Sequence, residues 1–241
     1  MNSSTPFILT LLALPVAADA ATIMAVVNSK DSIIGLRQSG GAALGYNVDG
    51  SGAVSNFTVG ASGGSGSRIH SNAIIGFTLP TLAAGEQLTA ATLSFTVTGA
   101  RDESSSNPNL DFYLLETADP SGSGIAFFDN DDTPAADSHL IGSYYRNITG
   151  NSQVSFTANE NSTFSGNALS YLQSLYTGNV PTQSEIFIRF NIDNGVEMGN
   201  LDRYVLDTDS YALELTSAPI PEPGAVTLGL LGCGILLRRR R

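Results

Sequence analysis

The densest group of potential metal ligands in the sequence is an acidic segment, FFDNDDTPAAD, at residues 127–137. It holds Asp129, Asp131, Asp132 and Asp137, and carboxylate oxygens this close together are ligands that Ca²⁺ prefers. The EF-hand pattern is absent, because no glycine stands at the sixth position of the segment and no distal glutamate follows. The segment therefore predicts a solvated acidic loop, with a calcium site as the alternative. No other cofactor is expected.

A distal group of acids, Asp202, Asp207 and Asp209, could join such a calcium site only if the fold brought it there. A glycosidase would need two carboxylates at a set separation, which a sequence does not display. Its cleft usually offers stacking aromatic side chains, and the chain has no tryptophan.

The only two histidines, His70 and His139, are the candidate bases for hydrolytic chemistry. A catalytic triad needs a nucleophile, a base and an orienting acid in one shaped site. Neither histidine lies in a nucleophile motif, and the sequence has no G-x-S-x-G. Both histidines are therefore predicted to be surface or strand-edge residues, and we expect no catalytic site and no enzymatic activity.

Composition and charge restrict the class of protein further. The 241 residues include 25 glycines and only 14% charged residues, which together with many β-branched side chains favours an all-β domain. The net charge is −11, and residues 21–219 alone hold 20 acids and 7 bases, a net charge of −13. This surface repels nucleic acid and anionic lipid. The single cysteine, Cys233, leaves residues 21–219 without a disulfide or a thiolate metal site.

Short segments with strand-like patterning, bounded by turn residues, follow one another along the chain and predict a β-sandwich. In the segment near Gln87 to Thr98, alternation places Leu93, Phe95 and Val97 on the core face and Leu88 on the opposite face. The other predicted strands are 32–36, 56–59, 68–78, 109–117, 138–149, 152–158, 184–193 and 204–216.

One helix is predicted within SGNALSYLQSLYTGN, because Leu169, Leu172 and Leu175 follow the spacing of an amphipathic helix. Ser165 could cap its start and Gly178 its end. We expect this short helix to pack one face against a sheet edge or the mouth of a barrel.

The first twenty residues have the features of a secretory signal peptide. An apolar run from Phe7 to Val16 precedes the small-residue site formed by Ala18, Asp19 and Ala20, which predicts cleavage after Ala20. No Lys or Arg precedes the run, so only the amino terminus supplies positive charge. We therefore expect an exported protein.

The chain ends with an apolar run of fourteen residues, Gly224 to Leu237, followed by Arg238, Arg239, Arg240 and Arg241. As a helix the run would cover about 21 Å, against about 30 Å for the hydrocarbon core of a bilayer. By the positive-inside rule, the arginines would stay in the cytoplasm. The tail is thus a short stop-transfer element that leaves the body outside. Cys233 is expected to be a small apolar residue within it.

The tail resembles the PEP-CTERM sorting signal of Gram-negative bacteria. The resemblance covers residues 218–241 and consists of Pro221-Glu222-Pro223, the Gly/Leu-rich transmembrane run 224–237 and the terminal arginines, in this order. It implies recognition by an exosortase, a membrane cysteine protease-transpeptidase, with processing near Pro221-Glu222-Pro223. It also implies an inner-membrane-anchored precursor and a mature protein at the cell surface or in extracellular polysaccharide, as in biofilms.

The body, residues 21–217, contains a core, residues 68–216, that resembles the DNRLRE-type jelly-roll domains of bacterial surface proteins. The resemblance is carried by Phe77-Thr78-Leu79-Pro80, Gly85 and the Ala90-Ala91-Thr92-Leu93 segment. These features together lead us to expect a surface or matrix protein with a non-catalytic structural or adhesive role. The alternative is a carbohydrate-binding module that contacts exopolysaccharide, and a third reading is a glycan-degrading enzyme.

Overall fold

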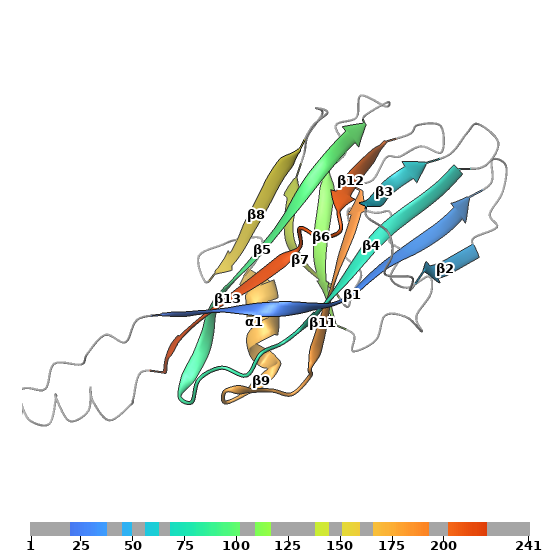
Figure 1. The fold of residues 1–241 in the computed structure, drawn as a ribbon. Coiled ribbons are helices and arrows are strands. Elements are labelled where there is room, and N and C mark those ends of the chain that lie inside the picture. Colours follow the sequence, from blue (N-terminus) through green and yellow to red (C-terminus); the bar gives the residue numbers. More distant parts are fainter. Residues whose placement is uncertain are drawn as a thin grey trace, which may run out of the picture.

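Antiparallel strands and one short helix make up the computed structural model, as the sequence predicts (Figure 1). The strands form a β-sandwich whose two sheets enclose an apolar core. The structure describes residues 20–37, 45–49, 56–62, 68–101, 109–116, 138–144, 151–159, 166–192 and 202–220.

The first sheet is built around β5 (Glu86–Arg101), the second longest strand. On one side β5 pairs with β8 (Ser152–Asn159), and on the other it pairs with β13 (Ala212–Pro219) and then β12 (Arg203–Asp207). Strands β12 and β13 lie end to end along the same side of β5, and a turn separates them.

The second sheet has the order β4-β11-β6-β7. Its central strand β11 (Glu185–Ile192) pairs with β4 (Arg68–Thr78) on one side and with β6 (Leu110–Leu115) on the other. The outermost strand, β7 (Ser138–Tyr144), pairs with β6 and carries a β-bulge. All these pairings are antiparallel.

Strand β1 (Ala21–Arg37) belongs to both sheets, because its first part pairs with β13 and the rest pairs with β4. The strand changes partner between Ala25, which pairs with β13, and Val26, which pairs with β4, and a register shift follows between Val27 and Ser29. Strand β2 (Gly45–Asp49) then pairs with the free side of β1. The crossing of β1 joins the two sheets along one side of the sandwich.

Strand β3 (Asn56–Ser62) makes a second crossing, and Gly60 is its pivot. Gly60 pairs both with Arg203 of β12 and with Ser71 of β4. Its φ of +105° lies in the region that residues with a Cβ rarely adopt. A Cβ at this position would also lie 2.5 Å from the carbonyl oxygen of Asp202 and would overlap the Ile192 side chain. Only glycine therefore fits this bend.

The helix α1 (Gly166–Ser174) lies on the opposite side of the sandwich and contacts β5, β7 and β8. It thus reaches both sheets, which agrees with the predicted packing against a sheet edge. Its buried residues include Leu169 and Leu172, as the spacing predicts. The predicted cap Ser165 lies outside the described residues.

The predicted helix cap at Gly178 is wrong. The helix ends at Ser174, and Gly178, with a φ of +63°, lies in the tight turn of the hairpin between β9 (Tyr176–Thr177) and β10 (Val180–Pro181). A glycine with positive φ suits a two-residue hairpin turn as well as a helix end, and the sequence alone does not separate the two uses.

Two further differences concern strands. The sequence predicts only 32–36 of β1, and it predicts one strand over 204–216 where Asp207 ends β12 and a turn follows. Leu88 also faces the core rather than the opposite face, because a register shift opposite Thr216 inserts one extra residue into β5. Beyond this bulge the alternation holds, and Leu93, Phe95 and Val97 are buried as predicted.

Replacing Gly60 with alanine tests the crossing of β3. We expect Gly60→Ala to lower the free energy of unfolding by at least about 2 kcal/mol, since it combines an unfavourable φ with two steric overlaps. Gly85→Ala is the matched control, because Gly85 has a φ of +80° but no heavy atom within 4 Å of the added Cβ. It should cost only about 1–2 kcal/mol. Equal losses in chemical denaturation would contradict the steric role of Gly60.

Candidate functional site

Several predicted site residues lie outside the described part of the chain. They are Ala18, Asp129, Asp131, Asp132, Asp137, Pro221, Glu222, Pro223, the run 224–237 with Cys233, Arg238, Arg239, Arg240 and Arg241. The described residues contain no group of three or more His, Cys, Asp or Glu side chains placed to hold a metal ion. No helix among them is long and apolar enough to span a membrane.

His139 lies on the outermost strand β7, which confirms the strand-edge prediction for this residue. Its Nε2 atom is 2.6 Å from the Glu116 carboxylate, and its ring stacks on Tyr171 of α1 with the centroids 4.8 Å apart. Burial raises the pKa of the Tyr171 phenol, and the nearby Glu116 adds to this rise. These contacts join the helix to the edge of the second sheet and present no nucleophile to the imidazole.

His70 lies on β4, where its backbone is paired on both sides, with Gly35 of β1 and Ala61 of β3. This position is inside the sheet rather than at its edge. The two histidines are therefore on different strands of the second sheet, and β11 and β6 separate β4 from β7.

The acids near the end of the body have separate surroundings. Asp202 is fully buried before β12. Asp207 and Asp209 belong to the turn between β12 and β13, where the Asp207 carboxylate accepts a hydrogen bond of 3.0 Å from the Asp209 amide. The hydroxyl of Ser210 donates to the Asp207 carbonyl at 2.8 Å. Asp207 therefore stabilises the turn that divides the two strands.

A layer of buried polar side chains covers the outward face of the second sheet, and we call it the outer polar layer. Its buried members are Asp111 and Tyr113 on β6 and Arg189 and Asn191 on β11, and the exposed Ser143 on β7 lies at its margin. Arg189 is fully buried, and its guanidinium carbon lies 4.8 Å from the centre of the Tyr113 ring. This distance is typical of a cation–π interaction.

The Asp111 carboxylate organises the other end of this layer. It accepts hydrogen bonds from the hydroxyls of Ser143 and Tyr113, the latter at 3.3 Å. In the register of β6 and β11, Asp111 lies opposite Asn191 and Tyr113 lies opposite Arg189. A buried charge is tolerated where other polar groups form hydrogen bonds or ion pairs with it. Here these polar groups come from three neighbouring strands. The layer thus connects β7, β6 and β11.

Sequence reasoning did not find the outer polar layer. In SEIFIRFNID the side chains of Ile186, Ile188 and Phe190 share one face of β11, and all three are buried in the main core. The opposite side of β11 is buried too, so that the strand is covered on both faces. The available signal was a charged residue within each of two otherwise apolar strands, Arg189 in β11 and Asp111 in β6.

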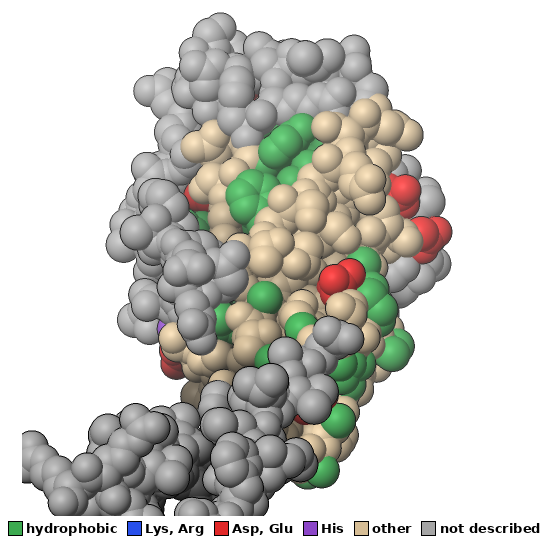
Figure 2. All heavy atoms as spheres, turned by 90° about the vertical axis from the view of Figure 1, so that its left-hand side faces the viewer, with side chains coloured by type: hydrophobic (Ala, Val, Ile, Leu, Met, Phe, Trp, Pro, Cys, Tyr) green, Lys and Arg blue, Asp and Glu red, His purple; other side chains and the backbone are tan. Residues whose placement is uncertain are grey.

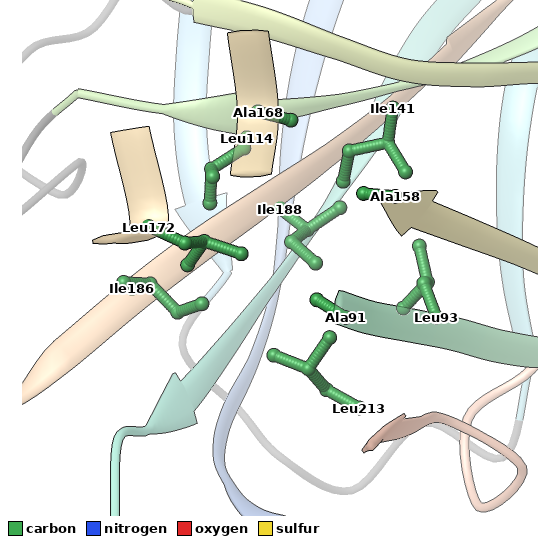
Figure 3. A pocket seen from close by; sticks show the side chains of 10 residues that line it. All are labelled: Ala91, Leu93, Leu114, Ile141, Ala158, Ala168, Leu172, Ile186, Ile188 and Leu213. Carbon is green, nitrogen blue, oxygen red and sulfur yellow. The ribbon is translucent and has the colours of Figure 1, made fainter. Parts of the chain in front are cut away.

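Among the described residues, an apolar internal cavity lies under α1 (Figure 3). Its volume is about 10 Å³, at the lower limit for one water molecule and far below the roughly 300 Å³ of small ligand sites. It is lined by Ala91, Leu93, Leu114, Ile141, Ala158, Ala168, Leu172, Ile186, Ile188 and Leu213. The side chains drawn in Figure 3 point inward from both sheets and from α1. This space is a small packing gap and offers no group for binding or catalysis.

Six tyrosines have a described side-chain burial, and none of the six is fully exposed. Tyr113, Tyr204 and Tyr211 are buried, and Tyr144, Tyr171 and Tyr176 are partly buried. Sugar-binding sites commonly stack pyranose rings on exposed aromatic faces. These six tyrosines therefore do not offer such a platform.

On β5 and β8, the outward face of the first sheet is a surface of uncharged polar side chains, which we call the hydroxyl face, and Glu214 of β13 lies beside it, opposite Thr92. It comprises Thr92, Ser94 and Thr96 on β5, and Gln153, Ser155 and Thr157 on β8, which lie opposite one another in register. Thr92 and Thr157 share a hydrogen bond of 2.9 Å between their hydroxyls. In Figure 2, seen from the side of the molecule that is on the left in Figure 1, backbone and uncharged polar atoms fill the middle of the view.

No protein-family model and no curated protein matches the chain. Among solved structures, a chain of broad bean stain virus is similar at 10% identity and a TM-score of 0.24, over 92% of both chains. A chain of the cowpea mosaic virus top component is similar at 10% identity and a TM-score of 0.23, over 86% of this chain and 91% of the viral one. TM-scores this low do not establish a common fold.

The outer polar layer predicts a specific dependence on Asp111. We expect Asp111→Ala to lower the free energy of unfolding by about 2–4 kcal/mol, because the buried Tyr113 hydroxyl loses its acceptor at about 1–3 kcal/mol and the exposed Ser143 loses a hydrogen bond of about 1 kcal/mol. Tyr113→Phe removes one of these hydrogen bonds and keeps the ring under Arg189, so its loss should be about half as large. Urea denaturation measures both. A loss for Asp111→Ala no larger than that for Tyr113→Phe would contradict the role of the carboxylate.

Two buried tyrosines predict how stability depends on pH. Burial raises the pKa of Tyr176 to about 12 and, with a contribution from Asp207, raises the pKa of Tyr211 well above its usual 10. Each folded-state phenol keeps its proton at a pH where the unfolded chain has lost it. Stability should therefore be unaffected below pH 10 and fall above it, by up to about 1.4 kcal/mol per pH unit for each tyrosine.

The two phenylalanine variants should differ at neutral pH. The Tyr176 hydroxyl donates to the Pro80 carbonyl at 3.0 Å, whereas the buried Tyr211 hydroxyl has no hydrogen-bond partner in the structure as described. Tyr211→Phe should therefore raise the free energy of unfolding by about 1 kcal/mol, and Tyr176→Phe should lower it by a similar amount. Both variants should weaken the alkaline loss. A pH profile of Tyr211→Phe identical to wild type would contradict this assignment.

Proposed function

We propose that this chain is an exported, non-catalytic protein of the bacterial cell surface or extracellular matrix, sorted by an exosortase through its C-terminal tail. Its body, residues 21–217, acts as a structural or adhesive domain of the DNRLRE-like jelly-roll type. The sorting part rests on the order of Pro221-Glu222-Pro223, an apolar run and four arginines at the end of the chain. The structural role of the body is supported by a β-sandwich in which the described cavity under α1 is too small for a ligand.

One observation carries the proposal: the described fold lies between the two expected processing positions. Strand β1 begins at Ala21, directly after the expected cleavage at Ala20, and strand β13 ends at Pro219, directly before Ile220 and Pro221. The two strands pair, with Ala21 opposite Ser217. The Ile220 amide also donates to the Gly85 carbonyl at 2.8 Å. Removal of residues 1–20 and of the tail would leave every described strand intact.

The sorting hypothesis predicts the C-terminus of the mature protein. In a host that has an exosortase, mass mapping of the surface form should find a terminus near Pro221-Glu222-Pro223 and no peptide that contains Arg238–Arg241. A variant with alanine at all three motif positions should keep these arginines and stay in the inner membrane, because the enzyme no longer recognises the tail. Mature surface protein that still carries the four arginines would rule out this processing.

A carbohydrate-binding role is the second candidate, and the hydroxyl face is the observation that favours it. Hydroxyls both donate and accept hydrogen bonds, as sugar hydroxyls do, and the threonines are stiff at χ1, so little side-chain entropy is lost on binding. Residues 87–100 of β5 and all of β8 are uncharged in a body whose net charge is −13. Such a surface suits a neutral polysaccharide and not an anionic one.

Binding to neutral polysaccharides tests this second role. If the hydroxyl face binds glycan, Ser94→Glu should weaken binding about tenfold or more, because it places an unpaired carboxylate in the contact. Thr22→Glu adds the same charge on exposed β1 of the same sheet, outside the face, and should bind as the wild type does. Equal binding of both variants in a pull-down with insoluble glucan or in titration calorimetry would argue against the hydroxyl face.

A further inference from the structure

Strand β8 is an edge strand with an unusually regular pairing to the rest of its sheet. Its eight residues, Ser152–Asn159, lie opposite Val97 to Ala90 of β5 without any register shift. Among the described strands, β5 is the only one that pairs with it. In Figure 1, β8 is drawn as the outermost strand of the first sheet. Its other side therefore presents a straight row of backbone N–H and C=O groups that no described strand uses.

The usual protection of an edge strand is missing from β8. Natural sheets shield their edges with lysine or other charges, with proline, with β-bulges or with very short strands. The sequence of β8, SQVSFTAN, has no charged residue and no proline, and its pairing has no bulge. The strand is also longer than the five residues or so of an average strand. Nothing in β8 itself therefore opposes the addition of another strand.

The outer strand of the second sheet is protected in the ways that β8 is not. The pairing of β7 with β6 contains a β-bulge, which bends the strand. His139 on β7 also forms a pair with Glu116. These features discourage pairing with a further strand at this edge. The difference between the two edges singles out β8.

The side chains of β8 leave its backbone approachable. Val154 and Ala158 point into the core and are buried, whereas Gln153, Ser155 and Thr157 are exposed on the hydroxyl face. A strand added beside β8 would meet small polar side chains on the outer face. Thr–Thr and Ser–Thr neighbours across a pair of strands stabilise it, as the Thr92–Thr157 hydrogen bond already does between β5 and β8.

We propose that β8 pairs antiparallel with β8 of a second copy of this chain, which makes a twofold-symmetric dimer with one continuous sheet. The charge distribution favours contact between two copies at β8. Two copies with a net charge of −11 repel each other over most of their surface. They approach with least repulsion where both partners are uncharged, at β8 and the adjoining part of β5. A twofold axis lets the same strand serve both partners, and the two hydroxyl faces merge into one.

This inference goes beyond the proposed function, because strand pairing depends neither on processing of the tail nor on glycan binding. The first experiment measures the mass of the full-length protein by sedimentation over a range of concentrations. A mild detergent, present in every sample, covers the apolar run 224–237. We expect a dimer for the wild type and a monomer for Ser155→Lys/Thr157→Lys, since lysines at an edge oppose strand addition.

The matched control is Thr22→Lys with Met24→Lys, which adds the same two charges at exposed positions of β1 in the first sheet, away from β8 and from the part of β5 beside it. This variant should remain a dimer. A monomeric wild type, or a Ser155→Lys/Thr157→Lys variant that associates as strongly as the control, would overturn the proposal. Circular dichroism of each variant separates loss of pairing from loss of folding.

The second measurement is disulfide trapping with single cysteine substitutions in β8. In a Cys233→Ala background, Gln153→Cys, Ser155→Cys and Thr157→Cys are oxidised singly and in pairwise mixtures. Directly opposed residues of an antiparallel pair are about 4.5–5.5 Å apart, within the range that a disulfide spans. One self-pair or one mixed pair should therefore cross-link selectively, and exposed Thr22→Cys should not. Cross-linking at β8 no greater than at Thr22 would refute the pairing.

Discussion

The contact of Phe95 with the aromatic rings of the opposite sheet is the interaction on which the sandwich depends. Phe95 extends from β5 and meets Phe112 of β6 and Phe190 of β11 edge to face, with centroids 5.2 Å and 5.0 Å apart. Tyr211, which precedes β13, packs against the same group, 5.4 Å from Phe190. Such edge-to-face pairs add to the free energy of area burial, and here they join the central strands of both sheets.

The closure of the sandwich follows from this packing and explains where its open edge lies. Two sheets held face to face can share strands along one side, and β1 and β3 do so, the latter through Gly60. On the other side β7 and β8 end the sheets, and α1 contacts both of them, while no described strand pairs with their outer sides. A bulge protects β7. The same architecture that removes edges at one side therefore leaves β8 as the regular edge at the other.

Sequence patterns predict the elements of this fold better than they predict its connections. Period-two alternation identifies the core faces of β5 and β13, because burial on one face and solvent on the other leaves a direct trace in residue type. The pattern fails at Leu88, because one inserted residue turns its side chain from the outer face of the sheet to the core. At Gly178 the sequence is ambiguous, because a hairpin turn and a helix end both favour a glycine with positive φ. The pattern also fails to predict the full length of β1. This strand belongs to two sheets, and that depends on which strands pair with it rather than on its own residues.

The candidate sites show the same limit more strongly. A buried Arg189 beside Tyr113 depends on the register of two strands that are distant in sequence, and no local pattern contains that register. The hydroxyl face, by contrast, is partly visible in LTAATLSFTVTGA as alternating threonines and serines, but only the pairing with β8 makes it a surface.

The strong negative charge of the chain distinguishes this surface from the rest of the molecule. In a chain with this many acids, β8 and the uncharged residues 87–100 of β5 form the region where a second copy is repelled least and where a neutral partner meets no charge. We therefore look for the activity of this protein on the outside of the first sheet and at its β8 edge rather than in a cleft.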